Sequence, residues 1–192
     1  MALVIQTEPA EEPLSIEEVK THLRVDMDDD DDLISSMIKT AREHAEDVTH
    51  RKLITQTWKY YLDEWPDCEY IELPFPPLKT VSSIKYTDYN LATTTMTLAT
   101  DYVVDTNKEP GRIVLAYGKT WPTATLHVTS PIEIIFICGF GTPEDIPEKI
   151  KSGMKIDLST YYENREDFLA GQQIEHLGIV DKLYYSSRIF IF

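Results

Sequence analysis

The stretch SIEEVKTHLRVDMDDDDDLISSMIKTAREHAEDVT, residues 15–49, contains signals for two helices and for the turn that joins them. Ser15 is followed three residues later by Glu18, the pattern of a reciprocal capping box, which predicts a short helix over residues 16–23. Apolar residues then recur at three- and four-residue spacing, which predicts a second helix over about residues 31–49. The N-terminal region is therefore expected to form a helical hairpin.

A β-rich region follows, from about residue 53 to residue 141, in which β-branched and aromatic residues are frequent and prolines recur. In TWKYYL, alternation places Trp58, Tyr60 and Leu62 on one face. The segment YVVDTNKEPGRIVLAYG predicts two strands joined through Pro110-Gly111, a favourable pair for the centre of a type II turn. IEIIFIC is apolar on both faces apart from its glutamate, which favours an interior strand.

The helical period returns after residue 141, and residues 169–192 form a C-terminal arm in which LGIVDKLYY predicts one or two further helical turns. The fold class predicted is α+β: an N-terminal helical hairpin and a C-terminal helix form a helical unit, beside a central antiparallel β-rich region. We expect one domain over residues 1–192, divided into a helical part at 10–50, β structure at 53–141, a long helix at 142–168 and the arm at 169–192.

The charge of the chain excludes one common way of binding DNA. Its net charge is −15 at pH 7, whereas proteins that grip nucleic acid by neutralising phosphates need clustered lysines and arginines. No specific nucleic-acid binding is expected, although DNA could still pass by such a surface. Two cysteines, no secretion signal and no apolar run long enough for a membrane helix indicate a soluble protein in a reducing cytosol.

The aspartate run is the most conspicuous local feature, with six aspartates in seven consecutive positions: Asp26, Asp28, Asp29, Asp30, Asp31 and Asp32. An EF-hand fails in two registers, because the required glycine and the closing glutamate are absent. Negative charge at a helix N-terminus is favourable by about 0.3–1 kcal/mol per well-placed group, so helix initiation within a solvated loop explains the run. A cation site remains the alternative interpretation.

The rest of the chain offers no recognisable catalytic or cofactor motif. The histidines lack metal-ligand spacing, CGFGTPED lacks a third glycine and a Walker lysine, and no nucleophile elbow is present. We therefore expect no enzyme activity, no catalytic residue, no metal and no cofactor.

The chain finishes in a strongly β-prone apolar segment, composed of Arg188, Ile189, Phe190, Ile191 and Phe192. Such residues are unusual at a terminus, which is commonly polar and frayed. One interpretation is a clamp folded onto the protein's own core. The other is an arm that binds a partner, by adding a strand to its sheet or filling a groove.

Several stretches together carry a resemblance to a known family: residues 11–58, IELPFPPLKTVSSIKY, DYVVDTNKEPGRIVLAYGKTWP, and IFICGFGTPEDIPEKIKSGMKIDLSTYYENRE. Over about residues 10–168, the chain resembles the head-tail connector proteins of tailed bacteriophages, also called adaptor or head-completion proteins, which prophages also encode. Residues 169–192 lie largely outside this resemblance.

The resemblance implies a non-enzymatic structural protein of the virion neck, assembled in the host cytoplasm. It implies a ring of about twelve subunits built by heterologous contacts, docked on the portal protein around the DNA channel, with its far side offered to a stopper or tail-completion protein. The C-terminal segment would contact the portal. If the acidic loop at 26–32 faced the channel of such a ring, its charge would repel phosphate; a position on the outer rim is the alternative.

Two other function classes stay open. An acidic inhibitor that mimics DNA would bind a host nuclease tightly, but the acids here gather in the N-terminal sixth rather than spreading over a surface. A carboxylate-metal hydrolase would cleave DNA in a divalent-dependent way and would lose this activity on Asp28→Ala.

Overall fold

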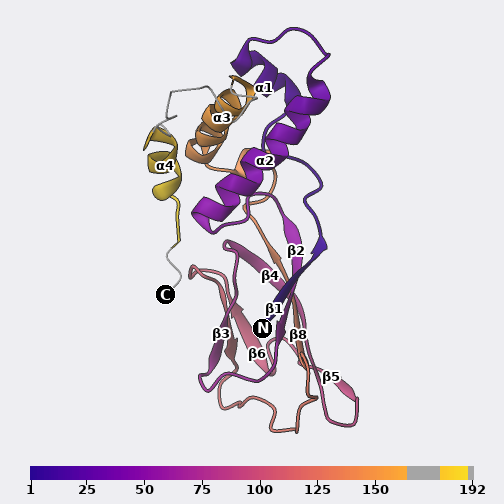
Figure 1. Ribbon diagram of the computed structural model, residues 1–192. Helices are drawn as coiled ribbons and strands as arrows, with labels where there is room; N and C mark the ends of the chain where they lie inside the picture. The colour runs from indigo at the N-terminus through magenta and orange to yellow at the C-terminus, as the bar shows by residue number, and fades with distance from the viewer. Residues whose placement is uncertain (164–177, 190–192) are drawn as a thin grey trace. The chain divides into compact units, whose positions relative to one another are not determined.

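In the computed structural model, which describes residues 1–163 and 178–189, the chain forms two compact units (Figure 1). The β unit comprises residues 1–9 and 55–139, and the helical unit comprises residues 10–54 and the described part of 140–192. Each unit has its own hydrophobic core. The predicted α+β class is confirmed.

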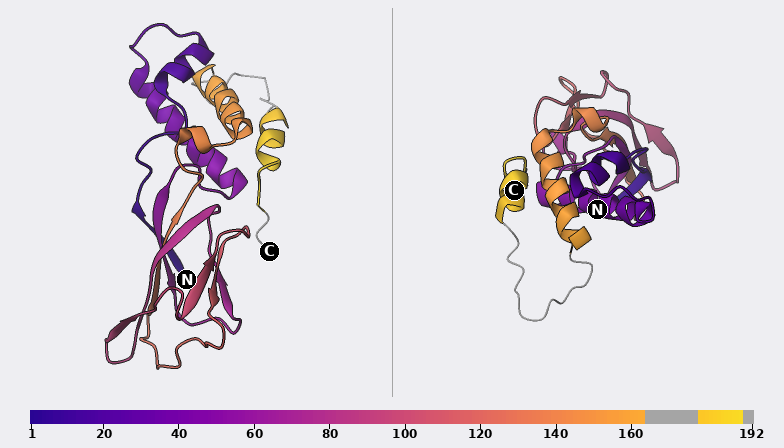
Figure 2. Two further views of the ribbon diagram at one scale, coloured as in Figure 1. Left: turned by 180° about the vertical axis from the view of Figure 1, so that it is seen from behind. Right: turned by 90° about the horizontal axis from the view of Figure 1, so that it is seen from above.

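Helix α2 is central to the helical unit and contacts the other three helices. The helices are α1 Ile16–Leu23, α2 Asp31–Thr49, α3 Glu148–Glu163 and α4 Gly178–Tyr185. Figure 2 shows α3, in orange, running beside α2, in purple. Ile34 and Ile38 of α2 meet Ile150 and Met154 of α3 in a core from which water is excluded. Truncating one of these isoleucines to alanine is expected to cost about 2–5 kcal/mol.

The two predicted N-terminal helices have the predicted bounds, but the capping box is only half formed. Ser15 Oγ accepts the Glu18 backbone N–H at 3.1 Å. The Glu18 carboxylate does not return to the cap; it pairs with Lys155 Nζ of α3 at 2.6 Å. The reciprocal bond was therefore predicted wrongly, because a tertiary ion pair with a charged donor replaces a bond to a backbone amide.

The segment after residue 141 begins with a short 3₁₀ helix, Pro143–Asp145, before α3. The Asp145 carboxylate accepts the Thr142 backbone N–H at 2.9 Å, so this turn carries its own capping box. Helix α3 starts directly after Pro147, and proline suits a helix start because its fixed φ is already close to the helical value. The one or two helical turns expected within the arm are confirmed as α4.

The β unit contains two antiparallel sheets. One has the order β1-β2-β8-β4-β5 and the other the order β3-β7-β6. The strands are β1 Ala2–Thr7, β2 Gln56–Leu62, β3 Tyr70–Glu72, β4 Leu78–Thr87, β5 Thr93–Thr95, β6 Tyr102–Asp105, β7 Arg112–Leu115 and β8 Ile132–Cys138. Strand β8 lies between β2 and β4, which confirms the prediction of an interior strand. Leu62, Trp58 and Tyr60 contribute to the core from one face of β2, also as predicted.

Strands β6 and β7 pair as the predicted hairpin, but the turn between them is not type II. The Glu109–Pro110 peptide bond is cis, and Gly111 does not have the positive φ that the third residue of a type II turn requires. Gly111 is needed for a different reason. A Cβ at this position would collide with the Leu78 side chain, so glycine permits close approach of the backbone to β4.

Candidate functional site

The acidic loop before α2 is partly neutralised by one lysine of α1. Lys20 Nζ lies 2.5 Å from Asp28 Oδ1 and 2.9 Å from Asp31 Oδ1. The hydrogen bond from Lys20 holds the pKa of the Asp28 carboxyl below its ordinary value, and the two aspartates raise the pKa of Lys20. This clamp joins the end of the loop to the preceding helix, which gives two of the six aspartates a structural role.

Asp30 and the exposed aspartates complete the loop. Asp30 occupies the N-cap position of α2, and its Oδ2 accepts the Tyr162 hydroxyl of α3 at 2.7 Å. Asp31 and Asp32 lie in the first turn of α2, which confirms the predicted role of the run in starting this helix. Asp26, Asp29 and Asp32 are exposed. These three aspartates take no part in the Lys20 clamp or in the Asp30–Tyr162 bond, and they present their charge to solvent.

The beginning of the C-terminal apolar segment is attached to the end of α2. The Ile189 backbone N–H donates to the Thr49 carbonyl at 3.1 Å, and the Ile189 side chain is buried. Arg188 Nη2 lies 3.2 Å from His50 Nε2, and its guanidinium lies over the Tyr185 ring at 5.3 Å from the centroid. Arg188 and Ile189 therefore pack against the helical unit. Phe190, Ile191 and Phe192 lie outside the described residues.

A buried polar cluster joins α2, α3 and α4. Asp157 Oδ2 accepts the Tyr184 hydroxyl at 2.8 Å and lies 2.9 Å from His44 Nδ1. The Asp157 side chain is 4% exposed, and Tyr184 is fully buried. Burial, followed by the nearby Asp157 charge, raises the pKa of Tyr184 well above its ordinary value. The cluster links the three helices by hydrogen bonds. The Tyr184–Asp157 bond lies in a water-poor site and is costly to lose, whereas the His44 side chain is 34% exposed.

A second buried network ties the chain on both sides of the hairpin to α2. The Glu46 carboxylate accepts the Leu53 backbone N–H at 3.0 Å and contacts Lys52 Nζ at 2.7 Å and Arg42 Nη1 at 3.4 Å. Arg42 Nε also donates to Glu12 at 2.7 Å. Because each charge has an opposite partner, the network tolerates burial, and it fixes the segments that enter and leave the helical unit.

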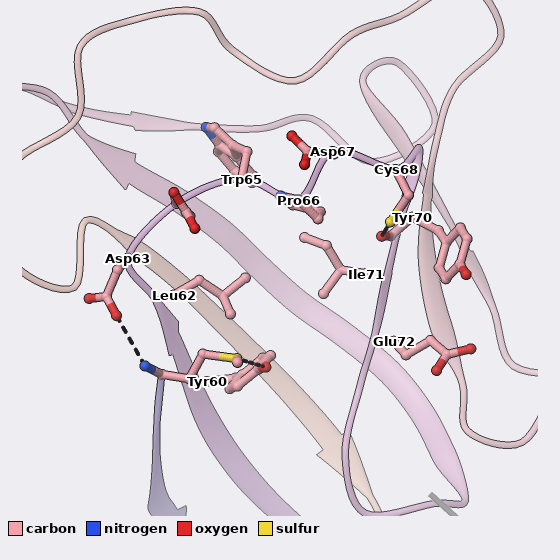
Figure 3. Close-up of a pocket in the computed structure, with 12 residues that line it drawn as sticks. Tyr60, Leu62, Asp63, Trp65, Pro66, Asp67, Cys68, Tyr70, Ile71 and Glu72 are labelled. Atoms are coloured by element: carbon pink, nitrogen blue, oxygen red, sulfur yellow. Dashed lines mark hydrogen bonds and ion pairs between the residues drawn. The ribbon is translucent and has the colours of Figure 1, made fainter. Parts of the chain in front are cut away.

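A cavity of about 590 Å³ in the β unit lies beside the N-terminus (Figure 3). The Met1 amino group contacts Asp63 Oδ2 at 3.0 Å and the Tyr60 hydroxyl contacts Met1 Sδ at 2.9 Å. The hydrogen bond from this amine lowers the pKa of Asp63. Among the lining residues, the amine is the positively charged group, whereas four side chains are acids: Asp63, Glu64, Asp67 and Glu72. An acidic lining of this kind disfavours phosphate-bearing ligands.

Among residues 1–163 and 178–189, three or more histidine, cysteine or acidic side chains do not come together as metal ligands. In the same part of the chain, every helix is too short or too polar to cross a bilayer.

Sequence reasoning missed the partners of the acidic loop and the strand β1. Tyr162 is 132 residues from Asp30, so no local pattern links them. Lys20 was a local signal, because it is one of two basic residues in the last turn of α1, only a few positions before the aspartate run. Strand β1 is exposed along its whole length, so it lacks the alternation that reveals a half-buried strand.

Comparison with solved structures shows the same fold in particles called gene transfer agents (GTA). A chain from the virion of a native GTA particle matches with a TM-score of 0.82 and 22% identity, covering 100% of this chain and 97% of that one. A chain from the neck of an empty GTA particle computed with C6 symmetry matches with a TM-score of 0.79 and 21% identity, at 100% and 98% coverage. A chain from the neck of a native GTA particle computed with C12 symmetry matches with a TM-score of 0.74 and 20% identity, covering 100% of this chain and 98% of that one.

Comparison with curated proteins gives no match. The model of one family, described as phage gp6-like head-tail connector protein, matches residues 13–109, just over half of the chain. This match includes the helical hairpin and strands β2 to β6, the last of which is the first strand of the β6–β7 hairpin. It agrees with the resemblance identified from the quoted stretches. The chain therefore belongs to the phage gp6-like head-tail connector protein family.

Proposed function

We propose that the chain is a non-enzymatic structural connector that forms a ring in the neck of a tailed-phage particle. The observation that carries the proposal is the family match, joined to the likeness of the whole fold to chains from GTA particles, two of them from necks computed with C6 and C12 symmetry. The ring comprises about twelve copies related by rotation, each using one surface against a different surface of the next. It assembles in the host cytoplasm.

One side of the ring binds the portal protein, and the other side receives a stopper or tail-completion protein. Residues 188–192 are the proposed portal contact. The attachment of Ile189 to Thr49 supports a division of labour within this segment, in which 188–189 anchor to α2 and the apolar residues 190–192 bind the partner. Deleting residues 190–192 should then weaken portal binding while leaving the unfolding transition of the helical unit unchanged. Equal portal affinity of the shortened and full-length chains would contradict this contact.

The DNA channel is proposed to run past the acidic loop. The exposure of Asp26, Asp29 and Asp32 supports this, because unpaired carboxylates repel phosphates and a ring multiplies their number. Changing these three residues to asparagine should leave the ring intact and slow DNA passage through particles. The matched control is the pair Asp28→Asn and Asp31→Asn, which removes the Lys20 clamp and should destabilise the hairpin instead.

The proposal is tested by mixing the purified chain with the portal protein of its own particle and imaging the mixture by electron microscopy. A ring of this chain seated on the portal is the expected result. A complex with a host nuclease and no affinity for the portal would favour the DNA mimic. Divalent-dependent cleavage of DNA that is lost on Asp28→Ala would favour the hydrolase.

A further inference from the structure

Strand β1 has an unusual combination of position and composition. It is an outer strand of the five-stranded sheet, bonded to β2 on one side. All six of its residues are exposed, and its apolar side chains are open to solvent, with 39% of Leu3, 49% of Val4 and 37% of Ile5 accessible. Proteins usually protect such an edge with charges, prolines or a covering segment, because it can accept another strand. Residues 1–7 contain neither a charged side chain nor a proline.

The opposite edge of the same sheet has the same character. Strand β5 pairs with β4 on one side, and its three threonines are exposed. Residues 89–100, which include β5, also contain no charged side chain, although 27% of the whole chain is charged. Leu91 and Leu98 flank the strand at 70% and 53% exposure. The five-stranded sheet therefore ends on both sides in uncharged, partly apolar edges.

The three-stranded sheet provides a contrast within the same unit. Its outer strands carry charged residues, Glu72 on β3 and Asp105 on β6. Glu72 is paired with Lys108 at 2.7 Å, and Asp105 with Arg112 at 3.0 Å. Charged pairs of this kind discourage strand addition. The absence of such protection is thus specific to the β1 and β5 edges among the described sheets.

The net charge decides which partner fits these edges. Each copy carries a net charge of −15, so two copies repel each other on average. The β1 and β5 edges avoid that repulsion, and they are different surfaces, as a heterologous contact between identical subunits requires. An added strand also satisfies the outward-facing N–H and C=O groups of both edges by main-chain hydrogen bonds.

We propose that β1 of one copy pairs with β5 of the next copy, so that the five-stranded sheet continues from subunit to subunit. Successive antiparallel pairings across the sheet leave β1 and β5 running in the same direction. The contact between copies related by a small rotation is therefore a parallel one. This inference rests on the proposed ring and names the surfaces that build it.

Disulfide trapping in the portal-bound assembly tests the contact. The pairing across the sheet puts Val4 on the same face as Thr93 and Thr95, whereas Thr94 points to the other face. In a Cys68→Ser background, which removes the exposed native thiol, Val4→Cys is combined with Thr93→Cys or with Thr95→Cys. At least one combination should give a ladder of linked chains up to the full ring under oxidation. Val4→Cys with Thr94→Cys is the matched control and should give little linking.

Single variants distinguish this contact from a symmetric one. A mixture of Val4→Cys chains and Thr95→Cys or Thr93→Cys chains should stop at linked dimers, and each single variant alone should remain unlinked. Linked dimers from Val4→Cys alone would indicate that β1 pairs with β1, and this would overturn the proposal.

A charge on the edge provides an independent measurement. Val4→Glu should reduce the fraction of portals that carry a ring at least tenfold. The monomer should stay folded, because Val4 is half exposed. Met27→Glu, at a 71% exposed site of the helical unit, is the control. Rings that form normally with Val4→Glu, and that give no ladder with either cysteine pair, would overturn the β1–β5 contact but leave the proposed function standing. Failure of the unmodified chain to form any ring on the portal would overturn both.

Discussion

Replacing Tyr184 with phenylalanine removes one hydroxyl from the buried cluster of α2, α3 and α4 and leaves the ring in place. The lost bond is the 2.8 Å contact to Asp157, a carboxylate whose side chain is 4% exposed. A hydrogen bond to a charged group contributes about 1.5–3 kcal/mol. No water can easily replace the hydroxyl, so we expect a loss of about 2 kcal/mol, or roughly a thirtyfold change in the unfolding equilibrium of the helical unit.

The assay is urea unfolding followed by circular dichroism at the helical wavelength, with the midpoint and slope fitted for the helical transition. Tyr185→Phe is the matched control, because Tyr185 is the neighbouring residue and is 54% exposed. Its loss of a solvated hydroxyl should change stability by less than about 0.5 kcal/mol. Equal midpoints for the two variants would refute the role assigned to the Asp157 cluster.

Three further predictions concern pH and packing. The pKa of Tyr184 is raised in the folded state, so the contribution of this tyrosine to folding stability is present below pH 10 and is lost progressively above it. Between pH 10 and 11, the free energy of unfolding of the wild type, measured with urea, should therefore fall by about 1 kcal/mol more than that of Tyr184→Phe. Arg112 lowers the pKa of Asp105, so the stabilisation of the fold by this ion pair is present above pH 3.8 and is lost as the pH falls below it. Asp105→Asn should therefore make the free energy of unfolding, measured with urea, less dependent on pH on the acid side, and an unchanged dependence would contradict the role of the pair. Gly153→Ala places a methyl group 2.5 Å from the Tyr184 ring. Overpacking costs about 1–3 kcal/mol and should outweigh the gain in helix propensity of about 1 kcal/mol, so the thermal unfolding midpoint should fall. A raised midpoint would argue against this contact.

The parts of the fold that could be predicted from sequence are those set by local chemistry. The Ser15 cap and the apolar spacing of residues 31–49 gave both helix bounds, because these signals act within one or two turns. The interior position of β8 followed from its apolar residues on both faces. In each case, one short segment contains the physical cause of its own structure.

The parts that could not be predicted depend on residues far apart in the sequence. The Glu18 carboxylate pairs with Lys155 instead of capping α1, and Asp30 accepts the Tyr162 hydroxyl, because α3 packs against the hairpin and supplies both partners. Gly111 is required by the approach of Leu78 rather than by its turn. The same holds for the candidate site: the aspartate run was visible, but which of its members are clamped and which are exposed depends on tertiary contacts.

The central claim is that this chain joins the head to the rest of the neck, and removing its gene from the phage or prophage that encodes it tests the claim most directly. The measurement is the fraction of purified particles that are tailed and retain their DNA, counted by electron microscopy and nuclease protection. The account predicts heads that lack tails and lose their DNA, with both defects restored by supplying the chain from a plasmid. Tailed, filled and nuclease-resistant particles formed without the gene would contradict it.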